Sequence, residues 1–165
     1  MWSITKQPSP MESVICSTVA SVLNELELPY ENQGKVFSLS LESEEAVFPT
    51  YIIADDENEV LSTIGIFPIK VSRTNLDRMC QFINGLNLKT MIGFFAIDPD
   101  DGQLLFCLAN NVDGGAINED IVKASLLQVA YRLRKNYEDI MKAMFGGEQF
   151  IFSFSDGKDL QEGRI

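Results

Sequence analysis

The stretch that decides the fold is MIGFFAIDPDDGQLLFCLA, residues 91–109. Two apolar segments, 91–97 and 104–109, flank an acidic segment that contains Pro99 and Gly102. Proline presets φ and glycine accepts a positive φ, so the acidic segment is typical of a tight turn. The pattern predicts a hairpin of two strands that are apolar without alternation, which is typical of strands covered on both faces.

Alternating side chains predict three more strands upstream, at residues 35–41, 47–54 and 59–67. The connections between them are too short for crossover helices. We therefore expect the three strands to form an antiparallel meander.

Helical periodicity predicts three helices. The first opens at Ser9-Pro10 and stops at Leu28-Pro29, and the third runs from Asn118 to about Phe145, where Gly146-Gly147 ends it. The second follows a cap at Thr74, and its expected buried face consists of Leu76, Met79, Cys80, Ile83 and Leu86, widened by Phe82.

The expected order of elements is α-β-β-β-α-β-β-α. This order predicts an α+β domain, a five-stranded antiparallel sheet with helices packed on one face. We expect a single domain over residues 1–147 and a C-terminal tail over residues 148–165.

Charge and composition exclude several classes of function. The chain has 24 acidic and 13 basic residues, a net charge of −11, and no histidine. Histidine-dependent nucleophiles and histidine-liganded metals are therefore excluded, and nucleic acid and anionic membranes are disfavoured as partners. Residues 1–60 hold eleven acids and two lysines. This excess is either a solvated face or a surface that steers a basic partner.

The cysteines and the N-terminus indicate a cytoplasmic protein. The three cysteines, Cys16, Cys80 and Cys107, are far apart and lie among apolar neighbours, which favours free thiols in a reducing compartment. The first residues lack the apolar stretch of a signal peptide, and no apolar run is long enough to span a bilayer.

No pattern of catalytic or ligand-binding residues emerges. The turn from Asp98 lacks the glycine and glutamate positions of an EF-hand loop, and Gly114-Gly115 belongs to no phosphate-binding motif. The acids at 55–57 are typical of a turn, although a weak divalent-ion contact there stays open. We therefore expect no enzyme activity, no catalytic residues, no cofactor and no metal.

A family resemblance rests on residues 76–87 and 91–104. A helix ends in the pair Leu86-Asn87, and a strand then leads through an acidic glycine turn to another apolar strand. This resembles the central signature of YbjN-type proteins and covers most of residues 10–147, without the tail. The resemblance implies a type III secretion chaperone-like fold, whose members are small, acidic and usually dimeric, and whose secretion chaperones bind extended client segments. YbjN-type proteins are named as candidate bacterial sensory transduction regulators and have no agreed catalytic residues, so none is carried over.

The sequence thus favours a non-catalytic protein-binding module, chaperone-like or adaptor, that acts as a cytoplasmic homodimer. The alternative is a small-molecule-sensing regulatory domain with a pocket between sheet and helices.

The homodimer follows from burial, because the predicted 91–97 and 104–109 hairpin is apolar on both faces and needs a second cover. We expect an isologous two-fold interface. Its candidate residues are Met79, Phe82, Leu86, Leu104, Phe106 and Leu108. The competing explanation is that the tail covers this surface with Phe150, Phe152 and Phe154.

Overall fold

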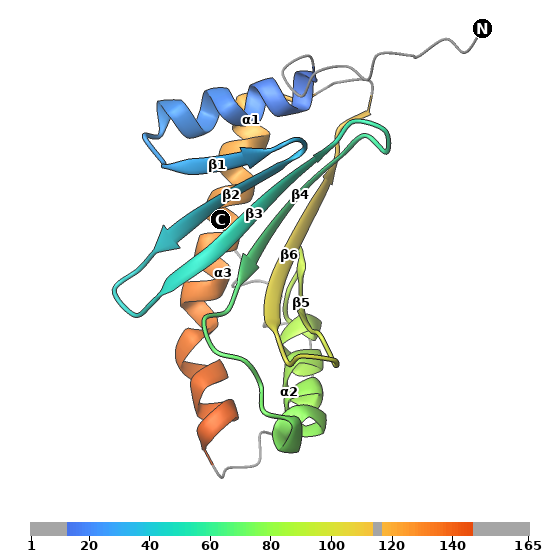
Figure 1. Cartoon of the computed structure of the whole chain (residues 1–165). Coiled ribbons are helices and arrows are strands. Elements are labelled where there is room, and N and C mark those ends of the chain that lie inside the picture. The colour runs from blue at the N-terminus through green and yellow to red at the C-terminus, as the bar shows by residue number, and fades with distance from the viewer. Residues whose placement is uncertain (1–12, 114–116, 147–165) are drawn as a thin grey trace, which may run out of the picture.

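The structure is a computed structural model of the chain, and it describes residues 13–113 and 117–146 (Figure 1). The order of elements is α1 (Val14–Glu25), β1 (Tyr30–Gln33), β2 (Val36–Glu42), β3 (Val47–Asp55), β4 (Val60–Ile66), the 3-10 turn η2 (Arg73–Asn75), α2 (Leu76–Leu88), β5 (Phe94–Ile97), β6 (Leu104–Asn111) and α3 (Glu119–Phe145). The predicted α+β class is confirmed.

The strands form one antiparallel sheet in the order β1-β2-β3-β4-β6-β5. The sheet has six strands, so the prediction of five was wrong. The missed strand is β1, which pairs with β2 across a turn at Gly34, where φ is +63°. Its sequence, Tyr-Glu-Asn-Gln, is short, polar and largely exposed, so it lacks the apolar alternation that reveals a strand.

The hairpin that decided the fold forms as β5 and β6. The Asp98 N–H donates to the Gln103 carbonyl at 2.9 Å, and Gly102, with φ of +75°, donates to the Asp98 carbonyl at 2.8 Å. The first strand of this hairpin is shorter than predicted, because Gly93 also has a positive φ and β5 begins only at Phe94.

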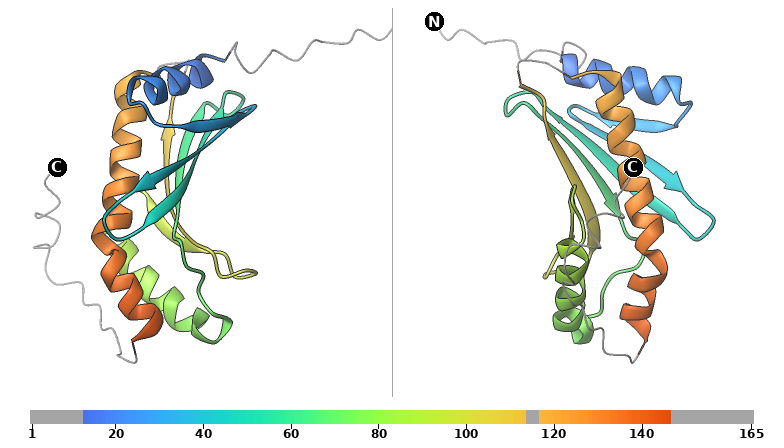
Figure 2. Two further views of the ribbon diagram at one scale, coloured as in Figure 1. Left: turned by 60° about the vertical axis from the view of Figure 1, so that its left-hand side comes forward. Right: turned by 180° about the vertical axis from the view of Figure 1, so that it is seen from behind.

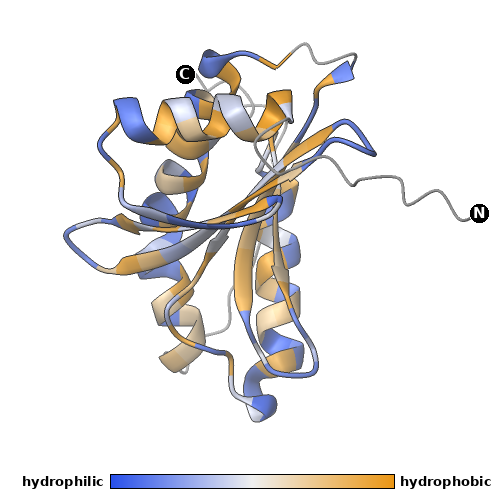
Figure 3. Ribbon diagram, turned by 45° about the horizontal axis from the view of Figure 1, so that its top comes forward, coloured by the Kyte–Doolittle hydropathy of each residue, from blue (hydrophilic) through white to orange (hydrophobic). Residues whose placement is uncertain are grey.

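All three helices pack on one face of the sheet. Figure 2 shows the sheet from its side, with α1 and α3 on the same face and α2 beside β5. The core consists of two clusters. One joins α1 and the start of α3 to β2–β4, and the other joins α2 and the rest of α3 to β5, β6, Phe48 of β3 and Phe67. In Figure 3 the strands are largely hydrophobic and the connecting turns largely hydrophilic. Helix α3 therefore ties the two halves of the core together.

Helix α3 approaches β4 closely at Gly65. A Cβ atom added at Gly65 would lie 2.4 Å from Leu133 Cδ1 and 2.7 Å from Val129 Cγ1. Only glycine allows the helix to pack at this distance from the strand.

The helix ends partly match the predictions. Helix α1 begins at Val14, where Ser13 Oγ accepts from the Cys16 N–H at 3.0 Å; the predicted start at Ser9-Pro10 lies outside the described residues. The prediction that Thr74 caps the second helix was wrong. Thr74 lies inside η2, and Asn75, the residue before α2, makes no side-chain hydrogen bond that caps the helix. The start of α3 is confirmed by Asn118 Oδ1, which accepts from the Ile121 N–H at 2.9 Å.

The buried face of α2 differs from the prediction at one cysteine. Met79, Phe82, Ile83 and Leu86 are buried, whereas Cys80 is exposed. Consecutive helical residues are separated by about 100° around the axis, so a stripe through Met79 and Ile83 turns Cys80 to the solvent.

Candidate functional site

The face of the sheet opposite the helices is uncovered within the described part of the chain (Figure 2). Along β6, Leu104, Phe106 and Leu108 are buried under the helices, whereas Leu105 and Cys107 are partly exposed on the other face. The described residues therefore cover the 104–109 segment on one face only.

Apolar side chains form a row across four strands on this uncovered face. Tyr51 lies opposite Ile64, Ile64 lies opposite Cys107, and Cys107 lies opposite Phe94. Directly opposite residues in an antiparallel ladder project to the same face. Tyr51 and Phe94, at the two ends of the row, are 39% and 49% exposed.

A second row lies beside the first. Leu105 stands opposite both Ile66 and Ala96. We call the two rows together the outer apolar face; its members are Tyr51, Ile64, Ile66, Phe94, Ala96, Leu105 and Cys107. None of the seven carries a formal charge, although the chain has a net charge of −11. Contiguous apolar patches on a protein surface mark interaction sites when they are large.

Exposed apolar side chains also lie at the C-terminal end of α2 and in the connection that leads into β5. Leu88 is 54% exposed, Met91 70% and Ile92 45%.

The six residues predicted as dimer contacts are buried within the single chain. They are all at most 8% exposed and belong to one core cluster of the single chain: Met79, Phe82, Leu86, Leu104, Phe106 and Leu108. They pack under α3 instead of facing solvent. Sequence reasoning missed the outer apolar face because both alternating sets of side chains in this hairpin are apolar, and periodicity alone does not say which set meets the helices.

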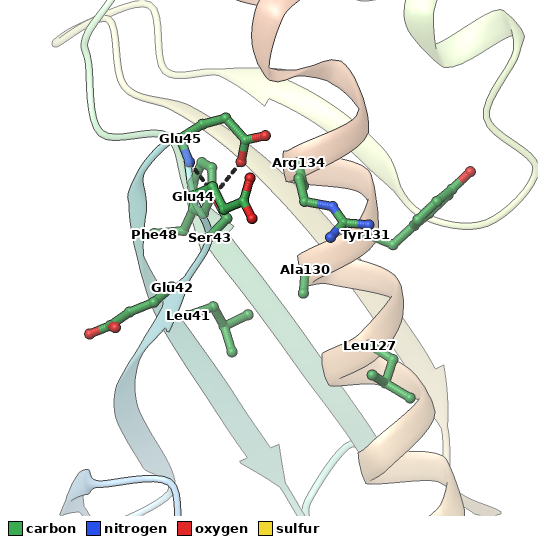
Figure 4. A pocket seen from close by; sticks show the side chains of 10 residues that line it. All are labelled: Leu41, Glu42, Ser43, Glu44, Glu45, Phe48, Leu127, Ala130, Tyr131 and Arg134. Carbon is green, nitrogen blue, oxygen red and sulfur yellow. Dashed lines mark hydrogen bonds between the residues drawn. The ribbon is translucent and has the colours of Figure 1, made fainter.

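A cleft of about 680 Å³ lies between the β2–β3 hairpin and α3 (Figure 4). Its residues are Leu41, Glu42, Ser43, Glu44, Glu45, Phe48, Leu127, Ala130, Tyr131 and Arg134. The hairpin supplies an acidic wall, and α3 supplies a wall that combines apolar side chains with a guanidinium. None of these residues was predicted as a site, since they come from segments that are far apart in the sequence.

Ser43 fixes the acidic wall of the cleft. Its hydroxyl accepts from the backbone N–H groups of Glu45 and Ala46, each at 3.2 Å, and donates to Glu45 Oε2 at 2.7 Å. This hydroxyl, the Glu45 backbone N–H and the charge of Arg134 hold the pKa of the Glu45 carboxyl below its usual value. The carboxyl is therefore ionised at neutral pH.

The helix wall presents two exposed apolar residues one turn apart. Leu127 is 70% exposed and Tyr131 is 44% exposed. The Tyr131 ring centroid lies 5.7 Å from the Arg132 guanidinium and 5.5 Å from Lys135 Nζ. Among residues 13–113 and 117–146, Arg134 makes no ion pair within 4.0 Å.

The acidic turns form local hydrogen bonds. The Asp55 carboxylate accepts from Asn58 Nδ2 at 2.9 Å and lies 3.6 Å from Lys35 Nζ, and these contacts, the Asn58 bond first, lower its pKa. In the described ranges no three histidine, cysteine or acidic side chains gather as a metal site. No helix in the same ranges has the length and apolar character to cross a membrane.

Comparison with known proteins identifies the fold. No protein-family model and no curated protein matches the sequence. Among solved structures, the chain is similar to a chain of the HopA1–SchA chaperone–effector complex, with a TM-score of 0.54, 14% identity, and coverage of 78% of this chain and 95% of that chain. It is also similar to YbjN, a candidate transcription regulator from E. coli, with a TM-score of 0.54, 15% identity, and coverage of 74% and 91%. The YbjN-like, secretion chaperone-like fold that the sequence resemblance implied is thereby confirmed.

Proposed function

We propose that this protein is a non-catalytic protein-binding module, chaperone-like or adaptor in type, which acts as a homodimer through the outer apolar face. The observation that carries the proposal is the double row of uncharged side chains on the sheet face that no described helix covers. The fold is shared with a chain of a chaperone–effector complex, which supports a role in binding proteins.

The chemistry of the outer apolar face favours a second copy of this chain as its occupant. The centres of protein interfaces are depleted in charge and enriched in aromatic residues, and this face has Tyr51 and Phe94 at its ends and no charge between them. A two-fold axis near Cys107 would place the row of one chain against the row of the other, so each patch would cover its equivalent.

The test is the mass of the protein in solution at micromolar concentration. We expect light scattering to give the mass of two chains for the wild type and of one chain for Phe94→Asp, because a buried unpaired charge costs several kcal/mol. Leu26→Asp is the matched control: Leu26 is 43% exposed at the end of α1, on the helix side of the sheet. It should remain dimeric.

Circular dichroism should show that both variants remain folded, since both side chains are exposed in the single chain. A monomeric wild type, or a Phe94→Asp variant that stays dimeric, would refute the homodimer at this face.

A further inference from the structure

We infer that the cleft between the β2–β3 hairpin and α3 is a docking site for an amphipathic segment of a partner protein, in which a large apolar side chain stands next to lysine or arginine. The inference rests on the proposed protein-binding function and names the chemistry of the partner. It concerns a surface on the helix side of the molecule, separate from the outer apolar face.

The large apolar side chains that α3 contributes to the cleft do not belong to the hydrophobic core. Helix α3 buries Leu126, Val129 and Leu133 against the sheet, whereas Leu127 and Tyr131 lie outside that stripe and are exposed. Two large apolar side chains one turn apart form a ridge along the helix. Across the cleft lie Leu41, which is partly buried, and Phe48, which is fully buried. An apolar side chain of a partner could therefore contact Leu127 and Tyr131 on the helix wall and the partly buried Leu41 on the hairpin wall.

The charges of the cleft select a basic segment. The hairpin wall carries the carboxylates of Glu42, Glu44 and Glu45, and the helix wall lining the cleft carries the guanidinium of Arg134. Figure 4 shows Glu44 and Glu45 on the wall opposite Arg134. Among the residues that line the cleft, the negative charges outnumber the positive one, whereas Arg132 and Lys135 lie beside the Tyr131 ring and outside this lining. Lysine or arginine beside the apolar anchor would therefore be attracted to the hairpin wall.

The Arg134 guanidinium favours a peptide segment over an isolated cation as the occupant of the cleft. Arg134 makes no ion pair within 4.0 Å in the described chain, although its charge acts on the Glu45 carboxyl, and its N–H groups can donate to backbone carbonyl groups of a docked segment. The carboxylates of the hairpin do not form a metal-binding group in the described ranges. A peptide segment with an apolar anchor, basic side chains and backbone carbonyl groups would match the apolar ridge, the acidic wall and the Arg134 guanidinium of the cleft.

The probe is a displayed library of short random peptides, selected against the full-length protein. We expect enriched peptides to combine leucine or an aromatic residue with adjacent lysine or arginine. Synthetic copies of the enriched peptides are then titrated by fluorescence anisotropy against the wild type and the variants.

Removing the apolar ridge should weaken the binding of these peptides. Leu127→Ser and Tyr131→Ala should each raise Kd about tenfold, the range of a central interface residue. Both residues are exposed, so each variant should fold like the wild type. If neither variant changes Kd, the inference is overturned.

Reversing a charge on the acidic wall should weaken binding and flatten its dependence on salt. Glu44→Lys should raise Kd several-fold at low ionic strength, with a smaller difference at high salt, because salt screens exposed charges. Glu138→Lys is the matched control, since Glu138 is exposed on α3 outside the cleft. If the two charge reversals raise Kd equally, the effect comes from the net charge of the protein and not from the acidic wall. That result would overturn the inferred preference for basic segments.

The remaining outcomes separate this inference from the proposed homodimer. Some peptides could bind Leu127→Ser like the wild type but fail to bind Phe94→Asp. Such peptides would dock on the outer apolar face, which would overturn the inference about the cleft and leave the proposed protein-binding function intact. Peptides that need Leu127 while the wild type is monomeric support the cleft and refute the homodimer. A library that yields no enriched peptide, or only acidic ones, overturns the inference, and a thermal shift by a small molecule alone would point to the sensing alternative.

Discussion

Asn87 and Phe95 exchange two hydrogen bonds between the end of α2 and the edge strand β5. Asn87 Nδ2 donates to the Phe95 carbonyl at 2.9 Å, and the Phe95 N–H donates to Asn87 Oδ1 at 2.8 Å. The side-chain amide thus takes the place that the backbone of a neighbouring strand would occupy. An unpaired strand edge is a template for pairing with other chains, and Asn87 closes it at Phe95.

Asn87→Ala should destabilise the protein by about 1–3 kcal/mol, because it leaves two backbone groups of a partly buried strand without their partner. Urea denaturation measures the loss, and faster hydrogen exchange at the Phe95 amide locates it. Asn84→Ala is the control, since Asn84 is exposed on the same helix. An unchanged exchange rate at Phe95 would show that the amide does not hold this edge.

The hydrogen bonds of Asn87 also explain the structural role of the pair Leu86-Asn87, on which the family resemblance rested. Leu86 belongs to the buried cluster under α3, and Asn87 pairs with β5. Hydrophobic periodicity accounts for the leucine alone. The role of the asparagine depends on where β5 begins after the turn at Gly93, so it becomes visible only in three dimensions.

The three cysteines should differ in their rate of alkylation. Cys80 is exposed and should react first, Cys107 is partly exposed, and Cys16 is 5% exposed and should react last. Burial raises the pKa of the Cys107 thiol, so a smaller fraction is the reactive thiolate at a given pH than for an ordinary cysteine. Mass spectrometry of the native protein at mildly alkaline pH measures the order, with urea-unfolded protein as the reference.

Cys107 also reports on the outer apolar face, because it lies opposite Phe94 in the β5–β6 ladder. If a second chain covers this face, Phe94→Asp should speed the alkylation of Cys107 and leave Cys80 unchanged. If Cys107 is alkylated at the same rate in the wild type and in Phe94→Asp, no second chain covers the outer apolar face at Cys107.

Gly65→Ala tests the close packing of α3 on β4. The new methyl group would overlap Leu133 and Val129, and we expect a loss of about 1–3 kcal/mol, typical of overpacking. Ser62→Ala, on the same strand but on its partly exposed face, should have a much smaller effect. Thermal or urea denaturation compares the two; equal stabilities would mean that the helix moves away from the strand without cost.

Much of the fold was predictable from the sequence because local patterns determine it. The hairpin at residues 98–103 follows from proline and glycine chemistry, and the meander follows from alternation and short turns. The polar strand β1 was not predictable in this way, since it exists only by pairing with β2. The cleft also lay beyond sequence reasoning, because it depends on how the hairpin at Ser43 meets α3.

The final prediction concerns the occupant of the outer apolar face, for which the tail is the competitor of a second chain. The three phenylalanines Phe150, Phe152 and Phe154 lie outside the described residues and alternate with other side chains in the sequence. If a second chain is the occupant, replacing all three with serine should leave the dimer mass and the slow alkylation of Cys107 unchanged. If the tail is the occupant, the wild type should be monomeric, and the triple variant should expose the face, alkylate faster at Cys107 and begin to self-associate. Both measurements stay constant if a second chain is the occupant and rise if the tail is the occupant, so the full-length protein and this one variant distinguish them.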